Sequence, residues 1–105
     1  MSLTESSSKY EKELYTRVGE VLHYIWDPIG VRGHPEARDE YDVYVPQVYL
    51  LLQGGATAEQ IALHLDKVVT ERIELNSNME RSLMASQKLL DWRAVLLRKR
   101  PEILG

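Results

Sequence analysis

The side chains best suited to chemistry lie in one short stretch of the sequence, from position 27 to position 42. Within these sixteen positions it carries five carboxylates and one imidazole: Asp27, His34, Glu36, Asp39, Glu40 and Asp42. Carboxylate oxygens together with an imidazole suit a divalent cation such as Mg²⁺, Ca²⁺ or Mn²⁺. Paired carboxylates can also move protons where burial or a partner separates their pKa values. The stretch is therefore a candidate site for binding or for acid–base chemistry.

The spacing of these residues matches no established metal or catalytic motif. It fits neither an EF-hand loop nor an HExxH helix, and the chain has no phosphate-binding glycine loop or nucleophile elbow. The chain contains no cysteine, which excludes disulfides, thiolate ligands and cysteine catalysis. We therefore assign no catalytic residue, no metal ligand and no cofactor, and the sequence favours a protein that is not an enzyme.

Structural roles explain the same carboxylates more simply. Asp27 would cap the turn that it makes with the following proline. Asp39 or Asp42 would cap the helix that comes next, because short acidic side chains are preferred at helix starts. Glu36 and Glu40 would then be solvated. These roles need no ligand.

Two arginines, Arg32 and Arg38, flank the acidic residues. A pair of guanidinium groups could clamp an anionic ligand through bidentate hydrogen bonds. We favour the simpler alternative, in which both arginines pair with their acidic neighbours and hold the loop closed.

Aromatic residues concentrate at the same loop and at the start of the next helix. Such residues anchor protein interfaces, but they also fill the space between a long loop and the helices beneath it. We place Trp26 and Tyr49 in the core, whereas both interpretations stay open for Tyr41 and Tyr44. The candidate interaction loop is therefore Trp26, Asp27, Arg32, His34, Arg38, Asp39, Glu40, Tyr41, Asp42 and Tyr44.

Two predicted helices flank this loop. Apolar residues at helical spacing predict a helix from Ser8 to Ile25, which the Asp-Pro pair at 27–28 ends. A second helix is predicted from Asp42 to Gln53, with its proline in the first turn, where a missing N–H costs little. The stretch from Trp26 to Tyr41 contains two prolines and two glycines, so we expect a long irregular connection, a length that is often functional.

Two further helices complete the predicted fold. The tetrapeptide Thr57-Ala58-Glu59-Gln60 is a capping box and starts a third helix that runs to about Leu75. Asn76-Ser77-Asn78 predicts a break, with one continuous helix as the alternative. The fourth helix is predicted from Met79 to Arg98.

The fourth predicted helix has two apolar stripes instead of one. The first contains Leu83, Leu90, Ala94 and Leu97, and the second contains Ala85, Leu89, Trp92 and Leu96. A helix in a four-helix domain usually buries a single face, so the excess suggests a partner surface. We take Leu89, Trp92 and Leu96 as a candidate dimer face, since twofold homodimers are the commonest assemblies.

Length and composition describe a single domain over residues 1–105. We expect residues 1–7 to be disordered and residues 76–105 to form a C-terminal helix that is an add-on or dimerisation element. The net charge of -3 gives no drive toward nucleic acid or membranes. No apolar run could span a bilayer, and the N-terminus lacks the pattern of a secretory signal, so the cytoplasm is the expected location.

Part of the sequence resembles a known family. The segments Trp26–Val31, Asp39–Asp42 and Tyr44–Pro46, with the later Gly55-Ala56-Thr57 and Thr70-Glu71-Arg72, are similar to the YugE-like family of small uncharacterised bacterial helical proteins. The likeness covers roughly Val18 to Leu75. It implies a helical fold and a bacterial origin, and it brings no activity, cofactor or catalytic residue. The fourth helix has no counterpart in it.

The sequence therefore predicts an all-α four-helix domain with a long irregular loop between its first two helices. The expected function is a non-enzymatic protein–protein interaction module. Its more specific form is an inhibitor or immunity protein whose acidic loop occupies a basic cleft. The alternative is a small divalent-metal-dependent enzyme or ligand-binding protein that uses the loop at 27–42.

Overall fold

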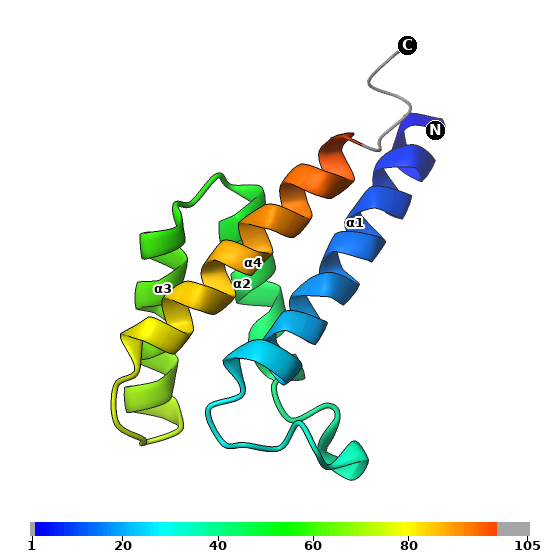
Figure 1. Cartoon of the computed structure of the whole chain (residues 1–105). Helices are drawn as coiled ribbons and strands as arrows, with labels where there is room; N and C mark the ends of the chain where they lie inside the picture. Colours follow the sequence, from blue (N-terminus) through cyan, green and yellow to red (C-terminus); the bar gives the residue numbers. More distant parts are fainter. Residues whose placement is uncertain (1, 99–105) are drawn as a thin grey trace.

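A computed structural model describes residues 2–98 of the chain, with side chains from residue 9 onward. Its main helices are α1 (Ser2–Val21), α2 (Val45–Gln53), α3 (Ala58–Lys67) and α4 (Met79–Arg98), shown in Figure 1. Shorter helical turns are η1 (Leu22–Trp26), η2 (Pro35–Ala37), η3 (Asp42–Tyr44) and η4 (Val68–Arg72). No strand occurs within residues 2–98. The predicted all-α four-helix fold is confirmed.

The first helix is longer than the sequence pattern indicates. It begins at Ser2 instead of Ser8, so residues 2–7, which we expected to be disordered, are helical. Its predicted core stripe is correct, because the side chains of Leu14, Val18, Val21 and Leu22 are buried. A π-helical turn, η1, extends the helix to Trp26.

The predicted second helix has a different start. Its first residues form the 3₁₀ turn η3, and α2 itself begins at Val45, which leaves Pro46 in the first turn as expected. The predicted cap by Asp39 or Asp42 is wrong, because no side chain caps η3 or α2. A 3₁₀ turn closed by backbone hydrogen bonds leads into the helix instead.

The third helix begins as predicted and ends slightly early. Thr57 and Gln60 form the full capping box, with hydrogen bonds of 3.1 and 2.9 Å. The helical turns end at Arg72, and Glu74 then takes a left-handed backbone conformation with φ of 63°. The chain therefore leaves the helix before Asn76, and the alternative of one continuous helix through this region is wrong.

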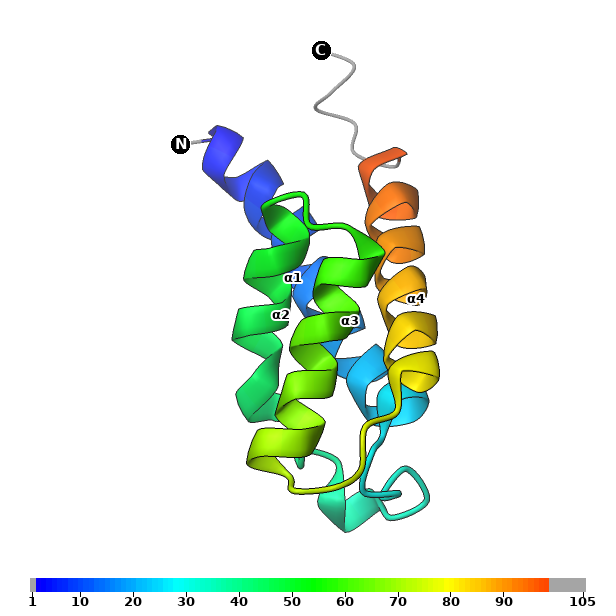
Figure 2. The same ribbon diagram turned by 90° about the vertical axis from the view of Figure 1, so that its left-hand side faces the viewer.

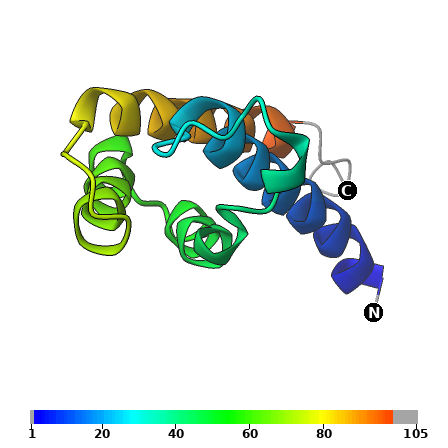
Figure 3. The same ribbon diagram turned by 90° about the horizontal axis from the view of Figure 1, so that it is seen from below.

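The four helices pack in a ring, in which α4 lies between α1 and α3 (Figures 1 and 2). From below, α1 and α4 form one layer and α2 and α3 the other (Figure 3). Neighbouring helices share one core, built mainly of aliphatic side chains with Trp26 and Tyr41. The loop after α1 covers one end of the bundle, opposite the end where α1 begins (Figure 1).

The position of α4 corrects the predicted dimer face. Leu89 and Leu96 are only 0% and 4% exposed and belong to the core. Trp92 is half-buried, and the guanidinium carbon of Arg17 lies 4.6 Å from the centre of its ring. A helix that packs against two neighbours has to bury a wide apolar surface, so the second stripe serves the fold within one chain. Leu89 and Leu96 are therefore not exposed as a dimer face, and Trp92 is partly exposed beside them.

No helix within the described residues is both long and apolar enough to cross a membrane.

Candidate functional site

Asp27 organises the loop that follows η1. Its backbone is left-handed, with φ of 33°, and its side chain is buried. The carboxylate accepts hydrogen bonds from the backbone N–H groups of Gly30 at 3.0 Å, Val31 at 2.7 Å and Arg32 at 3.2 Å. Asp27 therefore caps the turn, as its place before a proline predicted.

Tyr41 ties the far end of the loop to the same carboxylate. Its hydroxyl donates a hydrogen bond of 2.7 Å to Oδ1 of Asp27 and accepts one of 2.9 Å from the backbone N–H of Ile29. Fourteen positions separate the two side chains, and both are buried. This pair fixes the two ends of the loop against each other.

The surroundings of this pair stabilise the ionised form of Asp27. Burial alone would raise the pKa of the Asp27 carboxyl, but the hydrogen bonds from Tyr41 and the three backbone N–H groups together lower it below its usual value. Burial and the adjacent Asp27 carboxylate raise the pKa of the Tyr41 hydroxyl far above its usual value. At neutral pH both shifts favour an ionised Asp27 carboxylate that accepts hydrogen bonds and a neutral Tyr41 hydroxyl that donates one. Neither group is poised for proton transfer.

Aromatic packing completes the base of the loop. The Trp26 ring contacts Tyr41 edge to face at a centroid distance of 5.4 Å and Tyr44 at 6.1 Å. Trp26 lies in the core, as predicted, and so does Tyr41, for which both roles were open. Tyr44 is half-buried against the core. Among the candidate loop residues, Trp26, Asp27 and Tyr41 therefore support the loop from inside and are not available as a contact surface.

The two arginines hold the outside of the loop in different ways. Nη1 of Arg32 donates to the backbone carbonyl of Tyr24 at 3.2 Å, and its Nε lies 4.0 Å from Asp27. Arg38 pairs with no carboxylate in the described part of the chain, and its guanidinium carbon lies 5.1 Å from the centre of the Tyr24 ring. The predicted acidic pairing therefore applies to Arg32 alone.

The remaining acidic residues do not converge. His34, Asp39, Glu40 and Asp42 are exposed, and the His34 ring lies 3.4 Å from Glu36, itself exposed. Residues 9–98 contain no group of three or more histidine, aspartate and glutamate side chains placed to hold a metal ion. Asp27 is engaged with backbone amides and Tyr41, so it does not join the exposed carboxylates of the loop in one cluster.

The loop does form one wall of a hollow of about 410 Å³ on the surface. Residues of α1 and the first residue of α2 also line it. Its lining residues are Tyr15, Thr16, Gly19, Glu20, Arg38, Asp42 and Val45. Two predicted loop residues, Arg38 and Asp42, are thus brought together with polar and aromatic side chains from α1.

Sequence reasoning missed the contribution of α1. Tyr15 and Gly19 lie outside the core stripe of α1, and Tyr15 is exposed. Tyr24, in η1, is also exposed while His23 beside it is buried, in agreement with the expectation that one of the two faces solvent. Aromatic residues off the buried stripe of an amphipathic helix are a signal that a helical projection would have shown. We call the hollow together with Tyr24 the loop face.

Comparisons of this chain with family models, curated proteins and solved structures found no match. Function therefore has to be inferred from the residues themselves.

Proposed function

We propose that this protein is a protein–protein interaction module that binds its partner through the loop face. The observation that carries the proposal is the hollow of about 410 Å³ between α1, the loop and the start of α2. Its rim carries the residue types that dominate binding energy in interfaces, namely tyrosine and arginine.

The hydrogen bonds beneath the loop support this proposal. A long loop that is free in solution loses conformational entropy when it binds, and this loss weakens the complex. Here Asp27 and Tyr41 join both ends of the loop, and the backbone N–H groups of residues 29–32 are engaged with their two side chains. The exposed side chains are therefore presented on a backbone that is already fixed.

The charges around the hollow suggest the chemistry of the partner. Asp42 and Glu20, which also pairs with Arg17 at 2.9 Å, line it together with Tyr15, a combination that would accept a lysine or arginine side chain. Asp39 and Glu40 add exposed negative charge next to it. A partner with a basic surface would be steered to this site, as expected for an inhibitor or immunity-type protein.

Affinity capture with matched variants tests the proposal. The protein and its Tyr15→Ala/Arg38→Ala variant would be used as baits for binding partners from the source cell. A Gln87→Ala/Lys88→Ala variant on the exposed side of α4 serves as the control. We expect a partner that the control retains and the loop-face variant loses. A partner retained equally by all three baits, or none at all, would refute a role for the loop face.

The acidic version of the proposal has its own test. Replacing Asp39, Glu40 and Asp42 by their amides removes three exposed negative charges without deleting side-chain volume. Association of the captured partner should slow, and its dependence on salt should become weaker, because steering by charge is screened by ions. An unchanged association rate would refute an inhibitor-like protein that steers a basic partner by charge. Binding of a partner through the loop face would still stand.

A second copy of the chain is the alternative partner. Sedimentation at increasing protein concentration distinguishes the two cases, because a homodimer forms without any other protein. Dimers that the Tyr15→Ala/Arg38→Ala variant abolishes would identify the loop face as a self-association surface.

A further inference from the structure

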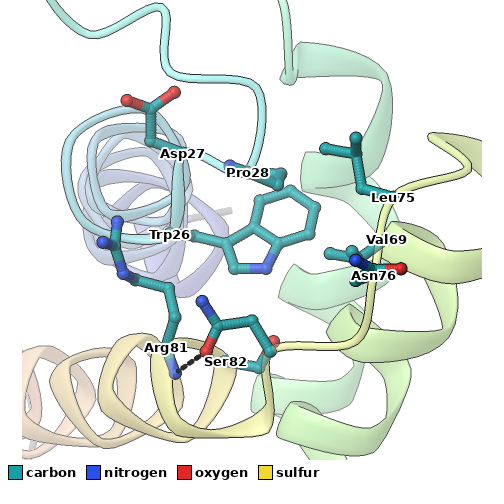
Figure 4. A pocket seen from close by; sticks show the side chains of 9 residues that line it. Trp26, Asp27, Pro28, Val69, Leu75, Asn76, Arg81 and Ser82 are labelled. Carbon is teal, nitrogen blue, oxygen red and sulfur yellow. Dashed lines mark hydrogen bonds between the residues drawn. The ribbon is translucent and has the colours of Figure 1, made fainter.

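A separate pocket of about 230 Å³ lies between the end of η1 and the beginning of α4 (Figure 4). The segment that joins η4 to α4 covers one side of it. The lining residues are Trp26, Asp27, Pro28, Val69, Leu75, Asn76, Asn78, Arg81 and Ser82. None of them lines the hollow of the loop face.

Two buried polar atoms in the wall of this pocket have no hydrogen-bond partner. They are Nε1 of Trp26 and Oγ of Ser82, and each residue is only 1% exposed. In Figure 4 the indole nitrogen points toward Ser82, whereas the guanidinium end of the Arg81 side chain extends away from it. Buried polar groups are nearly always paired, so two unpaired groups in one pocket indicate that something else supplies the partner. The indole N–H can only donate, and the missing partner is therefore an acceptor.

Arg81 adds positive charge to the same wall. One of its nitrogens donates to the backbone carbonyl of Ile25 at 3.2 Å. No carboxylate among residues 9–98 forms an ion pair with it. Asp27 also lines the pocket, but its oxygens already accept from Tyr41 and three backbone N–H groups, and its carboxylate points away from the indole in Figure 4.

The geometry points to a binding site for a small carboxylic acid. We propose that its carboxylate accepts hydrogen bonds from Trp26 and Ser82, and that Arg81, which lines the same pocket, supplies the balancing positive charge. Two oxygens, each with two lone pairs, match this set of donors, and the negative charge balances Arg81. The unpaired indole N–H can only donate and Arg81 is cationic, so an anion is favoured over a cation there, and an apolar ligand would leave the same groups unpaired.

The connection between η4 and α4 controls access to this site. Both unpaired atoms are covered by their neighbours, so a ligand reaches them when this connection moves outward. Glu74 has a left-handed backbone conformation there, and Asp66 alone accepts the hydrogen bonds from the Ser77 hydroxyl, at 2.7 Å, and the Asn78 amide, at 2.8 Å. Leu75 is tied to η4 by a hydrogen bond from its N–H to the carbonyl of Val69, but Ser77 and Asn78 are held through Asp66, so opening this part of the connection breaks few hydrogen bonds.

Titration followed by ¹H–¹⁵N NMR tests the proposal. Acetate and succinate are the probes, inorganic phosphate is the competing anion, and sodium chloride controls for ionic strength. The indole N–H signals of Trp26 and Trp92 are told apart with a Trp92→Phe variant. We expect a saturable downfield shift of the Trp26 indole proton when a carboxylate is added, because its N–H then donates to a charged acceptor. The Trp92 signal should not shift, because its indole lies outside this pocket.

Variants assign the contacts. Arg81→Gln should weaken binding about tenfold or more, because the balancing positive charge is lost. Lys88→Gln, which removes a positive charge from the exposed side of the same helix, should leave the affinity unchanged. Ser82→Ala provides a second variant, in case Arg81→Gln does not fold, and should weaken binding several-fold.

Three results would overturn the proposal. If the Trp26 indole signal does not shift with either carboxylate at millimolar concentration, water alone supplies the hydrogen-bond acceptor for its N–H. Tighter binding of phosphate than of either carboxylate would assign the pocket to a different anion. Equal weakening by Arg81→Gln and Lys88→Gln would show nonspecific attraction to the helix.

Discussion

The hydroxyl group of Tyr41 donates a hydrogen bond of 2.7 Å to Oδ1 of Asp27, fourteen positions earlier in the chain. Both side chains are buried, and the same carboxylate also accepts three backbone N–H groups from the turn that follows it. One buried group thus fixes the beginning of the loop, and one tyrosine attaches its end. The exposed residues between them owe their positions to this pair.

Removing the Tyr41 hydroxyl should destabilise the protein without disturbing its aromatic packing. Tyr41→Phe keeps the ring against Trp26 but takes a donor from Asp27 and an acceptor from the Ile29 amide. We expect a loss of about 1–3 kcal/mol in the free energy of unfolding, measured by urea denaturation. Tyr44→Phe is the control, because its hydroxyl makes no hydrogen bond with residues 9–98, and it should change little.

Stability should depend on pH through Asp27 in the acid range. Its folded-state pKa is lowered from the usual 3.8, so the ionised form is bound more tightly in the native state. The resulting stabilisation is complete above about pH 5 and is lost progressively as the pH falls through the lower folded-state value. Asp27→Asn should therefore be less stable at pH 7. Its free energy of unfolding should also decline less steeply than that of the parent protein below about pH 4. Parallel pH profiles for the two proteins would contradict this assignment.

Two glycines in the loop should respond differently to alanine. Gly30 has a φ of +84°, in the left-handed region, whereas Gly33 does not, and a Cβ would meet nothing within 4 Å at either position. Gly30→Ala should cost about 1–2 kcal/mol from backbone strain alone, and Gly33→Ala should cost much less. Thermal melts of both variants at one pH provide the comparison. Equal melting midpoints for the two variants would mean that the turn after Asp27 rearranges to accept a side chain at position 30.

A pair of leucines on α3 tests the assignment of the core. Leu65 is fully buried, whereas Leu63, two positions earlier, is 61% exposed. Leu65→Ala should lower the free energy of unfolding by about 2–5 kcal/mol, because it removes buried volume and leaves a cavity. Leu63→Ala should stay within about 0.5 kcal/mol of the parent protein. Similar losses of unfolding free energy for the two variants in urea melts would mean that the buried face of α3 is assigned wrongly.

Local sequence patterns were sufficient for most of the fold. The apolar spacing of Leu14, Val18 and Leu22, and the capping box at Thr57, each depend on neighbours within a turn or two of helix, and both were predicted correctly. The turn cap at Asp27 is equally local. Such features are encoded by residues close together in the chain.

Some errors were local, namely the start of the first helix and the predicted cap of the second, and the others concern contacts between distant residues. The apolar excess of α4 suggested a dimer face at Leu89, Trp92 and Leu96, but whether a stripe faces solvent or a second helix depends on tertiary packing. The bond between Tyr41 and Asp27 joins residues that no helical period relates. The hollow likewise needs α1 and the loop to meet in space.

Hydrogen–deuterium exchange at the Val31 amide tests the central claim most directly. This N–H donates a hydrogen bond of 2.7 Å to Oδ1 of Asp27, although the residue belongs to no helix. If Asp27 and Tyr41 hold a preformed loop, the Val31 amide should exchange slowly in the parent protein and markedly faster in Tyr41→Phe. Exchange at the rate of an unstructured peptide in the parent protein would show that the loop is open, and the loop face would lose its physical basis.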